Sequence, residues 1–126
     1  MFTDPTPAEI LAAAVRWNLD WGDKVDWLED LAAEDPENPP RALLERPEIP
    51  SHLQELWHAF VSLSTCRPLV GGSVGPIPWV AIDCYARRYG IDGEEFERLT
   101  EVVAAMDSAF ISKAIEMRAA RETQES

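Results

Sequence analysis

The stretch from Leu53 to Ser64 reads Leu-Gln-Glu-Leu-Trp-His-Ala-Phe-Val-Ser-Leu-Ser, and it decides the fold class of this chain. Its apolar residues recur at positions 53, 56, 57, 60 and 61, which is close to the spacing of one face of a helix. The pattern predicts an amphipathic helix that begins at a capping box in residues 51–54 and ends near Arg67-Pro68. Its apolar face must be buried against other elements of the chain.

A loop follows this helix. Residues 67–78 read Arg-Pro-Leu-Val-Gly-Gly-Ser-Val-Gly-Pro-Ile-Pro, and three glycines and three prolines in twelve positions predict a loop with a specific backbone geometry. This loop lacks the lysine that a phosphate-binding loop has, and the prolines after its glycines have no N–H group to donate. We therefore expect a structural clasp between two amphipathic helices, and no phosphate site.

The chain after the loop predicts two more helices. The first has Pro78 at its first position and stops at Gly90. The second follows an acidic cap in residues 92–95, and its apolar positions keep a nearly heptad spacing: Phe96, Leu99, Val103, Met106, Phe110, Ala114 and Met117. Residues 118–126 are polar, so we expect them to fray.

Two shorter helices are predicted in the N-terminal part of the chain, before the apolar stripe that begins at Leu53. The first follows a capping box in residues 6–9 and stops at Gly22, and the second is capped by Asp23. They carry Trp17, Trp21 and Trp27. Two short helices can hardly bury three tryptophans alone, so these side chains must dock on the main unit or on a partner.

The sequence thus predicts an all-α protein, a small bundle of about five helices with the Gly/Pro-rich loop between the third and the fourth. We divide the chain into four segments. These are an acidic, tryptophan-rich helical pair (1–34), a proline-rich linker or strap with room for a short turn at 41–45 (35–50), a main helical unit (51–117) and a frayed polar tail (118–126).

The charge of the chain is strongly negative. The formal net charge is -12, and residues 1–50 alone hold 12 acidic and 4 basic residues. This balance opposes phosphate binding and predicts no nucleic-acid partner, whereas it suits a soluble protein or a basic partner. Because no apolar run is long enough for a membrane span and the N-terminus does not read as a signal peptide, we expect a cytoplasmic protein without a membrane partner. Cys66 and Cys84 are expected to act as small hydrophobes on or beside the apolar stripes.

Residues that could carry chemistry are few. His52 and His58 are six positions apart, which is not the i, i+4 spacing of a metal pair, and we expect no catalytic, cofactor-binding or metal-binding residue. Asp83 and Asp107 each interrupt an apolar stretch. We interpret them as structural acids that cap a helix, accept a loop hydrogen bond or pair with an arginine, and the specific expectation is that Arg67 and Asp107 tie the loop to the last helix.

The aromatic side chains of the main unit are expected to be mostly core. They are Trp57, Phe60, Trp79, Tyr85, Tyr89 and Phe110. If Trp79 lies in the core, its replacement by alanine should cost about 3–5 kcal/mol.

Three ordered motifs run through residues 56–110: Leu56-Trp57-x-x-Phe60-x-x-Leu63-Ser64-x-x-Arg67, Gly75-Pro76-Ile77-Pro78-Trp79-x-x-Ile82-x-x-Tyr85, and, after Gly90, Met106-Asp107-x-x-Phe110. This ordered set resembles a small family of tail assembly chaperones, encoded beside the tape-measure gene in the tail modules of long-tailed bacteriophages and prophages. The resemblance implies a non-enzymatic protein that binds the tape-measure protein, keeps it soluble and helps to recruit tail-tube subunits. The first 50 residues lie outside the resemblance.

Ten residues form the resulting hypothesis for partner binding: Trp57, Phe60, Arg67, Trp79, Tyr85, Asp107, Phe110, Trp17, Trp21 and Trp27. An apolar groove lined by the aromatic stripe would suit a chaperone for a helical partner. The alternative is an acidic inhibitor or adaptor that occupies a basic site, for example as a nucleic-acid mimic, and such a protein should display a dense acidic face. Whether the chain forms a homo-oligomer stays open.

Overall fold

The computed structural model describes residues 4–125, and its architecture is helical. The all-α prediction is confirmed, with one small hairpin added. The α-helices are α1 (Pro7–Trp21), α2 (Val25–Glu34), α3 (Arg41–Leu44), α4 (Gln54–Ser64), α5 (Trp79–Arg88) and α6 (Gly93–Glu125). Two 3-10 turns, η1 (Gly22–Lys24) and η2 (Ser51–Leu53), and the strands β1 (Leu69–Val70) and β2 (Ser73–Val74) complete the elements.

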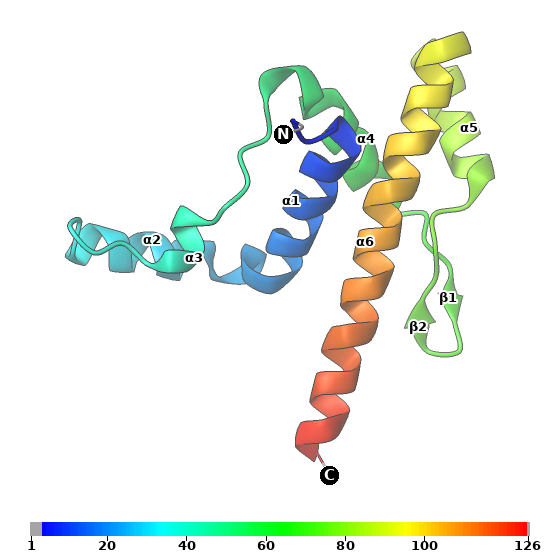
Figure 1. Ribbon diagram of the computed structural model, residues 1–126. Coiled ribbons are helices and arrows are strands. Elements are labelled where there is room, and N and C mark those ends of the chain that lie inside the picture. Colours follow the sequence, from blue (N-terminus) through cyan, green and yellow to red (C-terminus); the bar gives the residue numbers. More distant parts are fainter. Residues whose placement is uncertain (1–3, 126) are drawn as a thin grey trace.

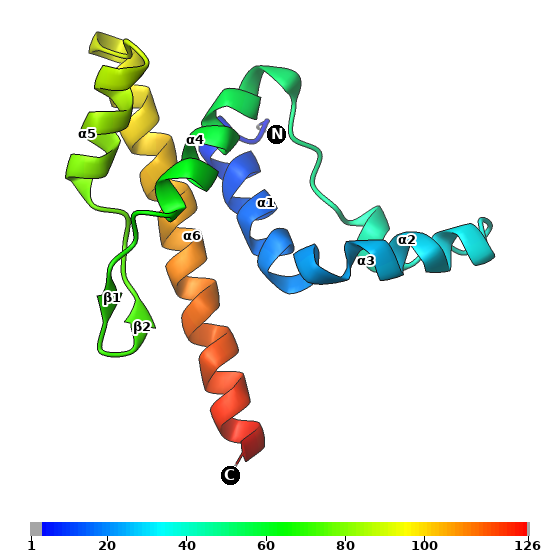
Figure 2. The ribbon, with the colours of Figure 1, turned by 180° about the vertical axis from the view of Figure 1, so that it is seen from behind.

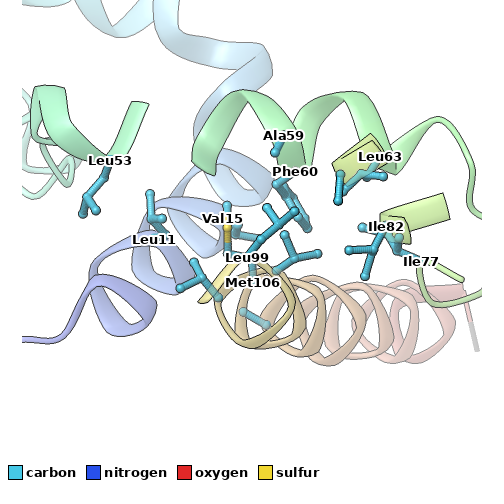
Figure 3. Close-up of a cluster of buried hydrophobic side chains, with 14 residues drawn as sticks. Leu11, Val15, Leu53, Ala59, Phe60, Leu63, Ile77, Ile82, Leu99 and Met106 are labelled. Carbon is cyan, nitrogen blue, oxygen red and sulfur yellow. The ribbon is translucent and has the colours of Figure 1, made fainter. Parts of the chain in front are cut away.

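Helix α6 is the central helix of the molecule. Helices α1 and α4 pack against it, and α5 contacts α4. Figures 1 and 2 show α6 between α1 on one side and α5 on the other. The buried cluster joins Leu11 of α1, Phe60 and Leu63 of α4, Ile82 of α5 and Met106 of α6 (Figure 3). Helix α1 therefore belongs to the same core as the helices of the main unit, although α2 and α3 separate it from them along the chain.

Several helix ends follow local signals in the sequence. Thr6 caps α1, because its Oγ1 accepts a hydrogen bond from the Glu9 N–H at 3.1 Å, and Pro7 occupies the first helical position. Gly90, with φ of +66°, ends α5 as predicted. The Ile91 N–H donates to the Ala86 carbonyl at 2.8 Å, which is the bond expected after a left-handed glycine.

Other predicted caps were wrong. Asp23 lies inside turn η1, and α2 begins after Lys24. Ser51 begins turn η2, so α4 starts only at Gln54, the last residue of the predicted capping box. Gly22 does follow the last residue of α1, but with a right-handed φ of -57° that lets the chain continue into η1. Pro78 is the residue before α5, not its first residue.

The predicted loop contains a β-hairpin. Leu69 pairs with Val74 and Val70 pairs with Ser73 in antiparallel register. Gly71 and Gly72 form its tip with φ of 57° and 81°, a conformation that strongly favours glycine at both positions of a tight hairpin turn. Strands of two residues are too short to show an alternating pattern, so the sequence could only predict a loop here.

Helix α6 is longer than predicted. The polar residues that we expected to fray after Met117 remain helical through Glu125, while Ser126 lies outside the described residues. Side-chain contacts accompany this extension: Lys113 pairs with Asp20 at the end of α1 at 3.0 Å, and Arg118 contacts both Glu122, four residues on, and the Ser73 hydroxyl of the hairpin.

Residues 22–45, called the α2–α3 arm below, extend away from α6 on the side opposite to α5 (Figures 1 and 2). The arm is attached at its base. Trp17 of α1 donates its Nε1–H to the Ala42 carbonyl at 2.9 Å, and the Arg46 guanidinium lies 4.9 Å from the centre of the Trp17 ring. Trp17 is buried, and both of these contacts are with residues of the predicted linker or strap, which was neither of the two alternatives considered for it.

Candidate functional site

An ion pair joins three parts of the main unit. Arg67, after the end of α4, pairs with Asp107 of α6, and their side chains are 4% and 13% exposed. Arg67 Nη1 also donates to the Gly75 carbonyl at 3.2 Å, and Asp107 Oδ2 accepts from the Ile77 N–H at 3.2 Å. The pair therefore fixes the end of α4 and the strand exit of the hairpin to α6, and the predicted Arg67–Asp107 contact is confirmed.

Aromatic rings cover the guanidinium of Arg67. Its Cζ lies 3.9 Å from the centre of the Phe110 ring and 5.5 Å from that of Phe60, and the two rings meet edge to face at 6.4 Å. Among the described residues, Arg67 Nε and Nη2 have no hydrogen-bond partner. Cation–π attraction to the rings partly compensates for this, and it is strongest at a desolvated site such as this one. Phe60 and Arg67 are thus buried inside the fold, with little surface left for a partner.

Two aromatic residues of α5 are not core, contrary to the prediction. Trp79 is 62% exposed and touches the body with one edge, at 6.2 Å from the Phe96 ring. Tyr89 is 66% exposed. Trp79 is the first residue of the ten-residue α5, and Tyr89 follows its last residue. The buried residues of the helix, Ile82 and Ala86, lie between them, so the ends of the predicted face extend beyond the elements that cover it.

The two cysteines, which we expected to act as small hydrophobes, also differ from the prediction. Cys66 and Cys84 are both exposed, and both are free thiols, so neither acts as a buried hydrophobe. Asp83, the other acid in an apolar stretch, pairs with Arg87 one turn further along α5 at 3.1 Å. This is one of the structural roles that we expected for it.

An open groove of about 630 Å³ lies between α4, the end of α5 and the start of α6. Apolar side chains line part of it, and polar side chains of both signs line the rest. Its lining comprises Leu56, Ala59, Ile91 and Leu99, the tyrosines Tyr85 and Tyr89, and the polar residues His52, Glu55, His58, Glu95 and Arg98. Its size lies within the usual range of binding pockets, about 300–1,000 Å³.

The groove gives one tyrosine an unusual environment. Burial raises the pKa of Tyr85, and the neighbouring Tyr89 and Glu55 raise it further. The Tyr85 and Tyr89 rings lie 4.7 Å apart. The neutral phenol of Tyr85 is therefore kept as a hydrogen-bond donor and acceptor at the edge of an apolar surface.

Of the predicted partner-binding residues, Tyr85 lines this groove. Trp57 and Phe110 are half-buried beside the core cluster. The sequence analysis missed Tyr89 and both histidines as residues of a common surface. A signal existed, because positions 52, 55, 56 and 59 share a helical strip next to the core stripe, but η2 and α4 had to be joined to see it.

A second hollow of about 350 Å³, called the arm cup below, lies between α2 and α3. Its lining is mainly apolar: Trp21, Trp27, Leu28, Leu31, Pro40 and Ala42, with Arg41 and Glu45 at the same hollow. Trp21 is half-buried there and Trp27 is 55% exposed. The three N-terminal tryptophans are thus divided, with Trp17 in the body and the other two in the arm cup.

Within residues 4–125, no three His, Cys, Asp or Glu side chains are grouped so that they could hold a metal ion. None of the helices in that range combines the length and the apolar character needed to cross a bilayer.

A helical scaffold with open, partly apolar hollows is an architecture suited to binding other protein chains. The comparison with protein families identifies the chain more closely. Residues 32–112 match the family model described as phage tail assembly chaperone, and these are 81 of the 126 residues (112 - 32 + 1). The chain belongs to the phage tail assembly chaperone family. No curated protein and no solved structure matches it.

The match contains the whole stretch of residues 56–110 on which the resemblance rested. It begins in the last part of α2 and ends within α6. Both the Arg67–Asp107 pair and the groove lie inside it, whereas α1 and most of α2 precede it.

Proposed function

We propose that this protein is a non-enzymatic tail assembly chaperone that binds the tape-measure protein in the groove between α4, α5 and α6 during tail morphogenesis in the host cytoplasm. The chaperone role in this proposal is inferred from family membership. We choose the groove as the binding surface because it is the larger of the two hollows described above and lies within the matched residues.

The chemistry of the groove suits an amphipathic helix. Leu56, Ala59 and Leu99 offer apolar contact, and the rings of Tyr85 and Tyr89 add apolar area with a hydroxyl at the end. A helix that lays its apolar face on such a surface repeats the common helix-in-groove mode of recognition. The formal charge of -12 would keep a complex with a hydrophobic partner in solution.

The use of the acidic residues supports a non-enzymatic role. Asp83 and Asp107, the acids that interrupt apolar stretches, are each engaged by an arginine. A carboxylate that is engaged by an arginine of the same chain has a structural role in the fold.

The alternative of an acidic inhibitor or adaptor has one observation in its favour, the accumulation of acidic residues in the first 50 positions. The family match does not favour it. A dense acidic face in the part of the chain outside that match is compatible with a chaperone that has a second, basic partner.

The test is co-expression of the full chain with the tape-measure protein encoded in the same tail module. We expect a soluble complex that co-purifies. Tyr85→Ala combined with Tyr89→Ala should weaken the complex by about tenfold or more, as expected when aromatic anchors are removed. Trp79→Ala is the matched control, because Trp79 is about as exposed as Tyr89 but does not line the groove.

Failure of the wild-type chain to co-purify with the tape-measure protein would contradict the proposal. So would equal effects of the tyrosine variants and of Trp79→Ala, because the groove would then have no special role. Circular dichroism of each variant shows whether the helical fold is retained.

A further inference from the structure

The α2–α3 arm carries much of the charge of the protein. Residues 20–37 contain eight acids and one base, so their net charge is -7 (1 - 8) out of the total of -12. The acids are Asp20, Asp23, Asp26, Glu29, Asp30, Glu34, Asp35 and Glu37, and the base is Lys24. Apart from Asp20, at the end of α1, these residues lie in the arm that Figures 1 and 2 show extending from the body.

The same arm leaves apolar side chains uncovered. In α2, Leu28 is buried, but Trp27 is 55% exposed, and Leu44 of α3 is 70% exposed. Trp21, Trp27 and Leu31 line the arm cup together with Pro40 and Ala42. A large apolar side chain left in water on a protruding element forgoes stabilisation that a bound partner would supply.

Contacts at the base of the arm fix the α3 side of the cup before any partner arrives. Trp17 and Arg46 attach α3 to α1 through the contacts already described, and Arg41 pairs with Glu45 at 2.8 Å beside the hollow. Lys24 lies 5.4 Å from the centre of the Trp21 ring. A preformed hollow lowers the entropic cost of binding, because fewer side chains must be ordered.

The lining of the cup carries one base and one acid, Arg41 and Glu45, which pair with each other, and further acidic residues flank its Trp27 side. Asp30 and Glu34 follow Trp27 by three and seven positions, so they share its side of α2, and both are exposed. An acidic or neutral helix that approached the cup would meet repulsion or no attraction from these carboxylates. A basic helix would be attracted over about a Debye length, roughly 8 Å at physiological salt.

We propose that the arm cup is a docking site for a basic amphipathic helix of a partner protein. One bulky apolar side chain of that helix enters the cup between Trp21 and Trp27, and lysine or arginine residues beside it face Asp30 and Glu34. The volume of about 350 Å³ suits an anchor side chain, which is how aromatic pockets commonly supply most of the energy of an interface.

This inference goes beyond the proposed function, because the cup and the groove share no lining residue. Trp21, Trp27, Leu28 and Leu31 also precede residue 32, where the family match begins. The other four lining residues, Pro40, Arg41, Ala42 and Glu45, lie within the match, so the cup joins a segment that precedes the matched part to the matched part itself.

The test uses the full-length protein and three fluorescein-labelled helical peptides of equal length, about 16 residues so that they form a stable helix. The first has a leucine and phenylalanine face and lysines on the other positions. The second replaces the lysines with glutamates, and the third keeps the lysines but replaces the apolar face with alanines. We expect the first peptide to bind, by fluorescence anisotropy, about tenfold or more tightly than either of the others.

Variants of the arm locate the binding. Trp27→Ala should weaken binding of the first peptide about tenfold, whereas Trp79→Ala, which removes a similarly exposed tryptophan from α5, should leave it unchanged. Asp30→Asn combined with Glu34→Gln should also weaken binding and reduce its dependence on salt, without removing any apolar side chain. Since these residues are exposed, both arm variants are expected to fold.

Four outcomes would overturn the proposal. The alanine-faced peptide could bind as tightly as the amphipathic one, which would leave charge alone as the cause. Trp27→Ala could leave binding unchanged, or Tyr89→Ala could abolish it, and the second result would move the peptide to the groove. Dissociation constants weaker than about 1 mM for the first peptide would also exclude a specific site.

Discussion

Replacing Asp107 with alanine should lower the free energy of unfolding by about 3–5 kcal/mol, because it leaves the Arg67 guanidinium buried without its counter-charge. The Arg67 side chain is 4% exposed, so water cannot easily take the place of the carboxylate. The Ile77 N–H also loses the acceptor that it now has at 3.2 Å. In a domain of this size, such a loss corresponds to a decrease in melting temperature of roughly 10–20 °C.

The measurement is urea unfolding followed by tryptophan fluorescence and by circular dichroism, with linear extrapolation to water. Asp83→Ala is the control, since it breaks an arginine–aspartate pair whose Arg87 side chain is 81% exposed. This exposed pair on one helix should contribute about 0.5 kcal/mol or less. Arg67→Met combined with Asp107→Asn removes both charges and keeps an acceptor for Ile77, so it should recover much of the loss.

Two results would refute this reasoning. If Asp107→Ala costs no more than Asp83→Ala, then the buried charge is solvated or finds another partner after the substitution. If the double variant is no more stable than Asp107→Ala, the cost comes from packing around the Phe110 ring and not from the uncompensated charge.

The other predictions concern exposure and pH. Trp79→Ala should lower the free energy of unfolding by about 1 kcal/mol or less, because one edge contact with Phe96 is lost. Phe60→Ala should lower it by about 3–5 kcal/mol. Equal losses of stability in urea unfolding would contradict the surface position of Trp79. The raised pKa of Tyr85 means that its neutral form is favoured in the folded state. Its contribution to stability is therefore complete below the ordinary pKa of 10.0 and is lost as the pH rises through the higher folded-state pKa. Tyr85→Phe should flatten this alkaline decrease in unfolding free energy, and a variant with the wild-type slope would contradict the assignment.

The parts of the fold that could be predicted from the sequence depend on neighbours along the chain. The Thr6-Pro7 start of α1 and the Gly90 end of α5 are set within a few residues, and both were predicted correctly. The apolar stripe of α4 could be predicted for the same reason, although Val61, which the spacing assigned to it, is 52% exposed. Arg67 and Asp107 are far apart in sequence, but two charged residues inside apolar stretches have few ways to be buried other than together.

The other features depend on which elements meet in space. Spacing places Trp79, Ile82 and Tyr89 on one face of α5, but it does not say that neighbouring elements cover only the middle of that helix. The groove is similar, because it is assembled from residues near 52–59, 85–91 and 95–99. The hairpin was missed for a different reason, since two-residue strands leave no period to detect.

The division of the tryptophans connects the fold to the two proposed surfaces. Trp17 is buried where α3 is attached to α1, so it fixes the arm to the body instead of binding a partner. Trp21 and Trp27 lie beyond that attachment, in a segment that contributes little to the core cluster around α6. Because the arm cup and the groove share no residue and lie on different elements, substitutions in one should add to substitutions in the other without coupling. A chaperone built in this way can hold a helix in its groove while the arm remains free for a second, basic chain.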